Sequence, residues 1–108
     1  KKSAADLLDR VMQLTDNAGA TNEHRALNYL ALRYSAIYHK VVDQFQRDFA
    51  LKEVETQLSR LSGTRKVVDA IFTFGHRQTD FTERFFVRVD VTEEFPFLVT
   101  KLSPYYNR

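Results

Sequence analysis

The fold is decided by a run in the middle of the chain, Val67-Val68-Asp69-Ala70-Ile71-Phe72-Thr73-Phe74. β-Branched and aromatic residues dominate this run, and these residue types favour strands. Because side chains alternate along a strand, Val68, Ala70, Phe72 and Phe74 share one side, which we expect to face the core. The run therefore predicts a strand over residues 65–75.

Three further segments have the composition of strands, namely residues 51–60, 82–92 and 96–103. The turn at Ser62-Gly63-Thr64 is short and contains glycine, which is typical of a hairpin. The expected inward-facing residues of these segments are Val54, Thr56 and Leu58; Phe85, Val87, Val89 and Val91; and Leu98, Thr100 and Leu102. Successive hairpins of this kind predict a four-stranded antiparallel meander.

The turns also set a register. Centring the first hairpin on Gly63 and the last on Glu93-Glu94 predicts these opposite pairs: Leu58 with Val68, Thr56 with Ala70, Val89 with Leu98 and Phe85 with Leu102. The matching offset for the middle hairpin pairs Phe72 with Phe85 on the inner face. On the outer face it pairs Asp69 with Arg88 and Ile71 with Phe86. An opposite-charge pair and an apolar pair on that face support the register.

The first half of the chain has helical periodicity and contains no proline before residue 50. It predicts one helix over residues 4–15 and a longer one over residues 23–48. The main apolar stripe of the longer helix comprises Leu27, Leu30, Tyr34, Ile37, Tyr38, Val41, Val42, Phe45 and Phe49. A second flank at Ala26, Tyr29, Leu32 and Ala36 widens it, so we expect contacts with both the sheet and the first helix. The expected class is α+β, with both helices on one face of the meander.

Composition restricts the function. The chain has 108 residues, 44% of them apolar, which suits one folded domain. It has no cysteine, which excludes disulfides and thiolate metal sites and fits a cytoplasmic location. The net charge of +2 comes from interspersed charges, so we expect no nucleic acid as partner. No apolar run approaches the roughly 18 residues that a spanning helix needs, so we expect no membrane as partner either. The chain begins with Lys1, which suggests a fragment of a longer protein.

No residue pattern indicates catalysis or a cofactor. His24 and His39 lie about 22 Å apart along one predicted helix and cannot share a metal ion. The adjacent Glu93 and Glu94 are typical of a solvated turn, and no nucleophile motif is present. We therefore expect no catalytic residues, no metal and no cofactor. A loop site of His76, Arg77 and Asp80 is the alternative that would make the domain a small catalytic contributor.

The outer face of the sheet is the candidate interaction surface. We assign to it Val67, Ile71, Phe86, Arg88, Phe97 and Val99. Apolar residues on a face without helices indicate a contact surface, although strand propensity alone also explains them. The meander leaves two edges that can accept a peptide strand, and charges at Glu53 and Glu55 oppose this at the first edge. Tyr105 and Tyr106 would dock on the domain or contact a partner.

Three runs carry a resemblance to a known family: LSGTRKVVD at residues 61–69, FFVRVDVTEEFPFLVTKLSPYY at residues 85–106, and RYSAIY at residues 33–38. They resemble the C-terminal domain of unknown function in cyanobactin maturation proteases of the PatA/PatG type, from the patellamide pathway. The resemblance is one of whole segments and includes no catalytic motif.

The resemblance implies that residues 1–108 form a single C-terminal accessory domain of a longer chain. Other domains of such chains, including a subtilisin-like protease, cleave and macrocyclise ribosomally made precursor peptides. The protease triad belongs to that separate domain, so the resemblance assigns no catalytic residue here. It implies a non-catalytic role in contacts with a precursor peptide, another pathway enzyme or a second copy of the domain. A purely structural role that stabilises the parent chain is the alternative.

Overall fold

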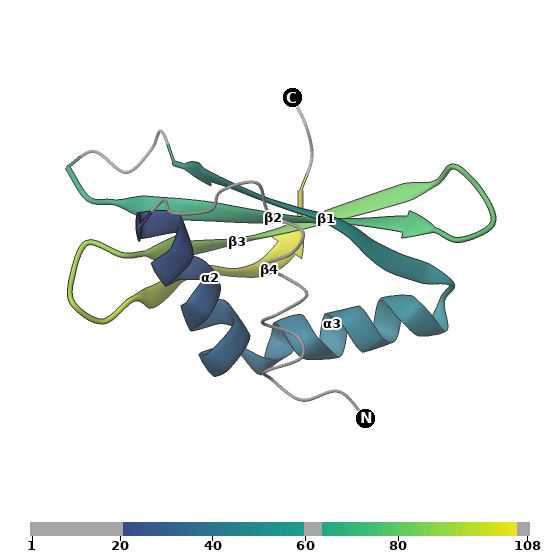
Figure 1. Ribbon diagram of the computed structural model, residues 1–108, viewed down its shortest axis with the longest axis horizontal. Coiled ribbons are helices and arrows are strands. Elements are labelled where there is room, and N and C mark those ends of the chain that lie inside the picture. Colours follow the sequence, from purple (N-terminus) through teal and green to yellow (C-terminus); the bar gives the residue numbers. More distant parts are fainter. Residues whose placement is uncertain (1–20, 60–63, 106–108) are drawn as a thin grey trace.

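The computed structural model describes residues 21–59 and 64–105 of the chain. Two helices, α2 (Thr21–Arg33) and α3 (Ser35–Gln46), precede four strands. The strands are β1 (Phe49–Leu58), β2 (Val67–His76), β3 (Thr82–Asp90) and β4 (Phe97–Pro104). They form one antiparallel sheet in the order β1-β2-β3-β4, and both helices pack on one face of it (Figure 1). The expected α+β class and meander are confirmed, and each strand begins and ends within two residues of its predicted bounds.

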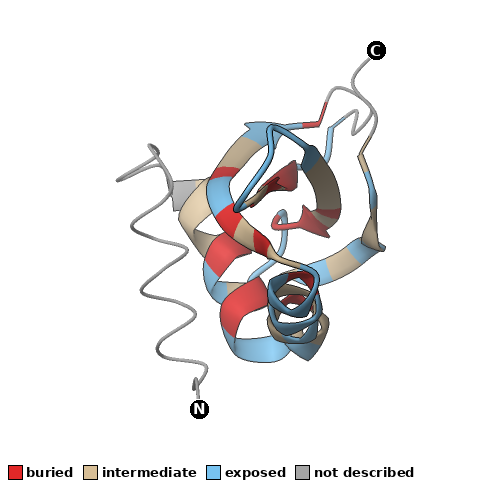
Figure 2. Ribbon diagram, turned by 90° about the vertical axis from the view of Figure 1, so that its right-hand side faces the viewer, coloured by how far each residue is buried: buried red, intermediate tan, exposed pale blue. Residues whose placement is uncertain are grey.

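One apolar core joins the helices to the sheet. Leu27 and Leu30 of α2 and Ile37 of α3 belong to the same buried cluster as the inward-facing side chains of the strands. In that cluster the strands contribute Phe49, Leu51, Val54, Val68, Ala70, Phe72, Phe74, Val87 and Val89. The buried positions lie where the helices meet the strands, whereas the faces of the helices that point away from the sheet are exposed (Figure 2). Burial of these side chains supplies the main driving force for this arrangement.

The predicted register is confirmed over most of the sheet. Leu58 lies opposite Val68, and Thr56 lies opposite Ala70. The middle hairpin likewise has the expected pairs, Phe72 with Phe85, Ile71 with Phe86 and Asp69 with Arg88, and the last hairpin pairs Val89 with Leu98.

The predicted pair of Phe85 with Leu102 is wrong, because Phe85 lies opposite Pro104. The register between β3 and β4 shifts on both sides of Arg88. These irregularities place extra residues on β4, so the distance from the turn no longer fixes which residues are opposite.

The single helix expected over residues 23–48 is wrong, because the chain breaks at Tyr34 into α2 and α3. Tyr34 leaves the helical conformation, with φ −118° and ψ 86°. Its hydroxyl accepts a hydrogen bond from the Leu102 backbone amide at 3.0 Å, which ties the break to β4. Residues 4–15, the other predicted helix, lie outside the described residues.

Two burial expectations are also wrong. Leu58 and Phe45, which we expected to face inward, are both mostly exposed. Gln44 is buried in their stead, and its amide donates a hydrogen bond to Glu83 Oε1 at 3.0 Å and accepts one from Arg47. A buried amide is tolerated when its hydrogen bonds are satisfied.

None of the described helices has the length and apolar character that a membrane crossing requires.

Candidate interaction site at the β3–β4 turn

The residues of the predicted outer surface differ in accessibility. Ile71 is only 1% exposed and Val67 is also buried, so neither offers its side chain to a partner. Phe97 and Val99 on β4 are both close to half exposed. The exposed apolar part of this surface is therefore confined to β4.

Phe86 and Arg88 are partly covered by contacts within the chain. Arg88 Nε donates a hydrogen bond to Asp69 Oδ1 at 2.7 Å, and its guanidinium lies over the Phe86 ring. The Tyr105 ring meets Phe86 edge-on, with centroids 5.8 Å apart. Tyr105 thus docks on the domain, which was one of its two expected roles, and Tyr106 lies outside the described residues.

The loop that offered a catalytic alternative is occupied by contacts that support the fold. Arg77 Nη2 pairs with Asp48 Oδ1 at 2.7 Å, and His76 Nδ1 accepts a hydrogen bond from the Gln78 amide. The Asp48 backbone has φ 68°, a left-handed conformation that Asp tolerates better than most residues. Within the described part of the chain, no hydrogen bond joins Asp80 to His76 or Arg77. A search of the same residues finds no group of three His, Asp or Glu side chains placed to hold a metal ion.

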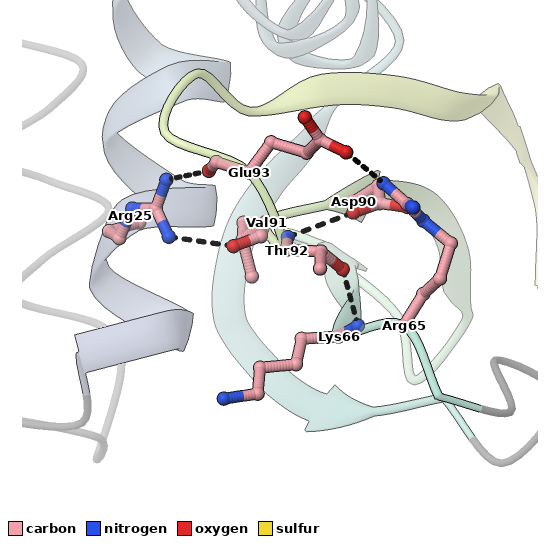
Figure 3. Close-up of polar contacts among 7 residues, drawn as sticks. All are labelled: Arg25, Arg65, Lys66, Asp90, Val91, Thr92 and Glu93. Atoms are coloured by element: carbon pink, nitrogen blue, oxygen red, sulfur yellow. Dashed lines mark hydrogen bonds and ion pairs between the residues drawn. The ribbon is translucent and has the colours of Figure 1, made fainter.

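The turn between β3 and β4 is exposed and is held by hydrogen bonds from distant parts of the chain. Arg25 of α2 reaches it and donates three hydrogen bonds to backbone carbonyls, of which Figure 3 shows those to Val91 and Glu93. Its Nη1 lies 2.6 Å from the Val91 oxygen, and its Nη2 bonds the oxygens of Glu93 and Glu94, the latter at 2.8 Å. A guanidinium suits this task because its donors form a rigid fork.

A second arginine holds the turn from the opposite side. Arg65 Nε donates to Asp90 Oδ2 at 2.5 Å, and its Nη2 lies 3.3 Å from Glu93 Oε2 (Figure 3). Asp90 is buried and also accepts the Thr92 amide, while the Thr92 hydroxyl accepts the Lys66 amide. The hydrogen bond from Arg65 lowers the pKa of the Asp90 carboxyl to about 2, against the opposing effect of its burial.

The fixed turn forms one wall of a groove of about 780 Å³ on the surface, and α2 forms the other wall. Its lining residues are Arg25, Asn28, Tyr29, Leu32, Arg33, Phe95 and Pro96. Leu32 is 56% exposed and Phe95 is 79% exposed, which is unusual for large apolar side chains. The groove can therefore bury apolar side chains of a partner between α2 and the turn.

The sequence pattern indicates one wall of this groove but not the other. Tyr29 and Leu32 belong to the second apolar flank of the helix, which we expected to contact the helix over residues 4–15. The turn residues Phe95 and Pro96 carried no functional signal beyond the resemblance. What identifies these residues is the set of hydrogen bonds from Arg25 to the carbonyls of the turn, which form only in the folded chain.

Comparisons with known proteins place the chain in a family. The family described as PatG C-terminal matches residues 1–105. A solved structure titled "PatG Domain of Unknown Function" superposes with a TM-score of 0.73 at 20% sequence identity. It matches 94% of this chain, and the chain spans 40% of that structure's length. A search of curated proteins found no match. Because the family match covers nearly all of the sequence, the chain belongs to the PatG C-terminal family.

Proposed function

We propose that the chain is a non-catalytic interaction domain that acts in ribosomal cyclic-peptide biosynthesis of the cyanobactin type. It works beside a subtilisin-like protease, in the cytoplasm, and its partner is the precursor peptide of that pathway. Membership in the PatG C-terminal family supports the context. The groove between α2 and the β3–β4 turn supports the contact role.

The observation that carries the proposal is the way in which Arg25 fixes the turn that bears Phe95. Three carbonyls of the turn are bound from α2, and Asp90 and Thr92 anchor its start. Phe95 is thus exposed on a segment whose backbone is held by these hydrogen bonds. A partner that binds a preorganised site pays a smaller entropic penalty. An exposed aromatic side chain on a fixed turn is also the type of residue that dominates binding energy at interfaces.

Phe97 and Val99 extend the proposed contact surface onto β4. Of the outer-face residues they are the ones with substantial exposure, while Val67, Ile71, Phe86 and Arg88 support them from within the sheet. Another pathway enzyme or a second copy of the domain would use the same exposed groups.

An amide chemical-shift titration tests this proposal. The isotope-labelled chain is titrated with the full-length precursor peptide. We expect saturable shifts at the amides of Asn28 to Arg33 and of Thr92 to Val99. Absence of shifts at millimolar peptide would refute the precursor as partner. Shifts confined to the hairpin around His76 to Phe81 would refute the groove as the site.

A further inference from the structure

We infer that the groove between α2 and the β3–β4 turn takes a peptide segment that combines carboxylates with apolar side chains. This inference rests on the proposed function and adds the chemical class of the ligand. It is carried by two features of the groove: the spacing of its apolar residues, and the absence of any ion pair between its arginines and the carboxylates of residues 21–59 and 64–105.

Helix α2 presents two distinct faces. Ala26, Leu27, Leu30 and Ala31 are buried and form the face toward the core. The groove face comprises Arg25, Asn28, Tyr29, Leu32 and Arg33, whose spacing of three and four residues defines one continuous stripe. Leu32 on this stripe and Phe95 across the groove are both exposed. An apolar side chain of a ligand fits between them.

The arginines of the described chain divide into two groups. Arg47, Arg65, Arg77, Arg84 and Arg88 each form an ion pair with an Asp or Glu of the chain. The two arginines of residues 21–59 and 64–105 that form none are Arg25 and Arg33, and both line the groove. Arg25 binds neutral carbonyls, and no carboxylate of the described residues forms an ion pair with it. No Asp or Glu is among the described lining residues.

The position of Arg33 defines where a ligand carboxylate binds. It is exposed beside Leu32 in the last turn of α2, and Tyr29 lies one turn earlier on the same stripe. A carboxylate can pair with the Arg33 guanidinium in a two-pronged contact. At the other wall, Glu93 and Glu94 are exposed in the turn, so the favourable field is confined to the α2 side. A uniformly charged polyanion such as a nucleic acid would meet repulsion there, which favours a peptide of mixed character.

Synthetic peptides test the inference. The probe is a capped, fluorescently labelled peptide of Leu, Glu and Ala, and its matched control has Gln in place of Glu. Fluorescence anisotropy measures the affinity of each for the chain. We expect the Glu peptide to bind about tenfold or more tightly than the Gln peptide and to lose affinity with added salt. Arg33→Glu should reverse the preference, so that a Lys version of the peptide binds best.

Control variants separate the groove from general electrostatics. Lys101→Glu on β4 makes the same change in charge outside the groove lining and should leave the preference for the Glu peptide unchanged. Glu94→Gln should strengthen binding of the Glu peptide by a few-fold, because it removes a negative charge from the turn.

Each outcome decides between the two proposals. Equal affinity for the Glu and Gln peptides overturns the acidic specificity, and the proposed function survives if the precursor peptide still binds. Failure of the Glu peptide to bind at millimolar concentration overturns the inference in the same way. Displacement of the peptide by an oligonucleotide at lower concentration would assign the arginines to nucleic acid. Loss of binding on self-association, measured by sedimentation, would assign the groove to a second copy.

Discussion

The Arg25 guanidinium on α2 donates a hydrogen bond to the carbonyl oxygen of Val91, sixty-six residues further along the chain, at 2.6 Å. This contact joins the first described helix to the end of β3. The same side chain binds two more carbonyls of the following turn. The position of Phe95 relative to α2, and with it the groove, therefore depends on Arg25, which alone among the described contacts of the turn comes from α2.

We predict that Arg25→Ala lowers the free energy of unfolding by about 1.5–3 kcal/mol, because three carbonyls lose a charged donor. Urea denaturation of the purified chain measures this change. Arg25→Lys should recover only part of the loss, since an ammonium cannot reproduce the fork.

Arg33→Ala is the matched control for this stability change, because Arg33 lies on the same face of α2 and forms no ion pair with any described residue. Its effect should stay within about 0.5 kcal/mol. Equal losses for the two alanine variants would show that Arg25 does not hold the turn.

We predict that Asp90→Asn destabilises the chain by about 1–3 kcal/mol at pH 7. The Asn oxygen can still accept the Thr92 amide, but its amide group then faces the Arg65 Nε donor. Because the folded-state pKa of Asp90 is lowered from 3.8 to about 2, its charge stabilises the fold fully above pH 4. That contribution disappears as the pH falls through the folded-state pKa.

Denaturation series between pH 7 and pH 2 measure this dependence. The difference in stability between the native chain and Asp90→Asn should shrink as the pH falls from 4 to 2. Glu83, whose pKa is lowered mainly by its hydrogen bond with Arg47, titrates in both proteins and cancels in the comparison. A difference that stays constant over this range would contradict a role for the Asp90 charge.

Tyr34→Phe should lower the free energy of unfolding by about 1 kcal/mol, since the Leu102 amide loses its acceptor. Hydrogen exchange provides a local readout, and we expect the Leu102 amide to exchange faster in the variant. Tyr38→Phe on α3 serves as control, because its hydroxyl forms no hydrogen bond with the described residues. Unchanged protection of Leu102 would rule out the link between the helix break and β4.

The register of β1 to β3 could be predicted because short hairpins and cross-strand pairs constrain each other. Asp69 with Arg88 and Ile71 with Phe86 followed from the register that the turns predicted, and both pairs form. The same logic failed for Phe85, because a bulge depends on tertiary contacts and leaves no local signature in the sequence.

The helix break at Tyr34 and the groove could not be predicted from local sequence patterns, because both depend on contacts between residues far apart in the chain. The periodicity runs through Tyr34 without interruption, and the break is stabilised by a hydrogen bond to a strand far along the chain. Arg25 binds backbone carbonyls, which every residue possesses, so no residue type marks its partners in the sequence. The apolar flank at Tyr29 and Leu32 could be predicted from the sequence, but the opposite wall of the groove could not.

The most direct test of the interaction role compares precursor-peptide affinity in two matched double variants by the shift titration described above. Leu32→Ala with Phe95→Ala removes the exposed apolar walls of the groove. Leu58→Ala with Phe81→Ala removes side chains of similar exposure, 55% and 71%, from β1 and from the hairpin at the far end of the sheet (Figure 1). We predict that the groove pair weakens binding by about tenfold or more, while the control pair stays within about twofold. Equal affinity of the two double variants would contradict the assignment of the groove as the contact site.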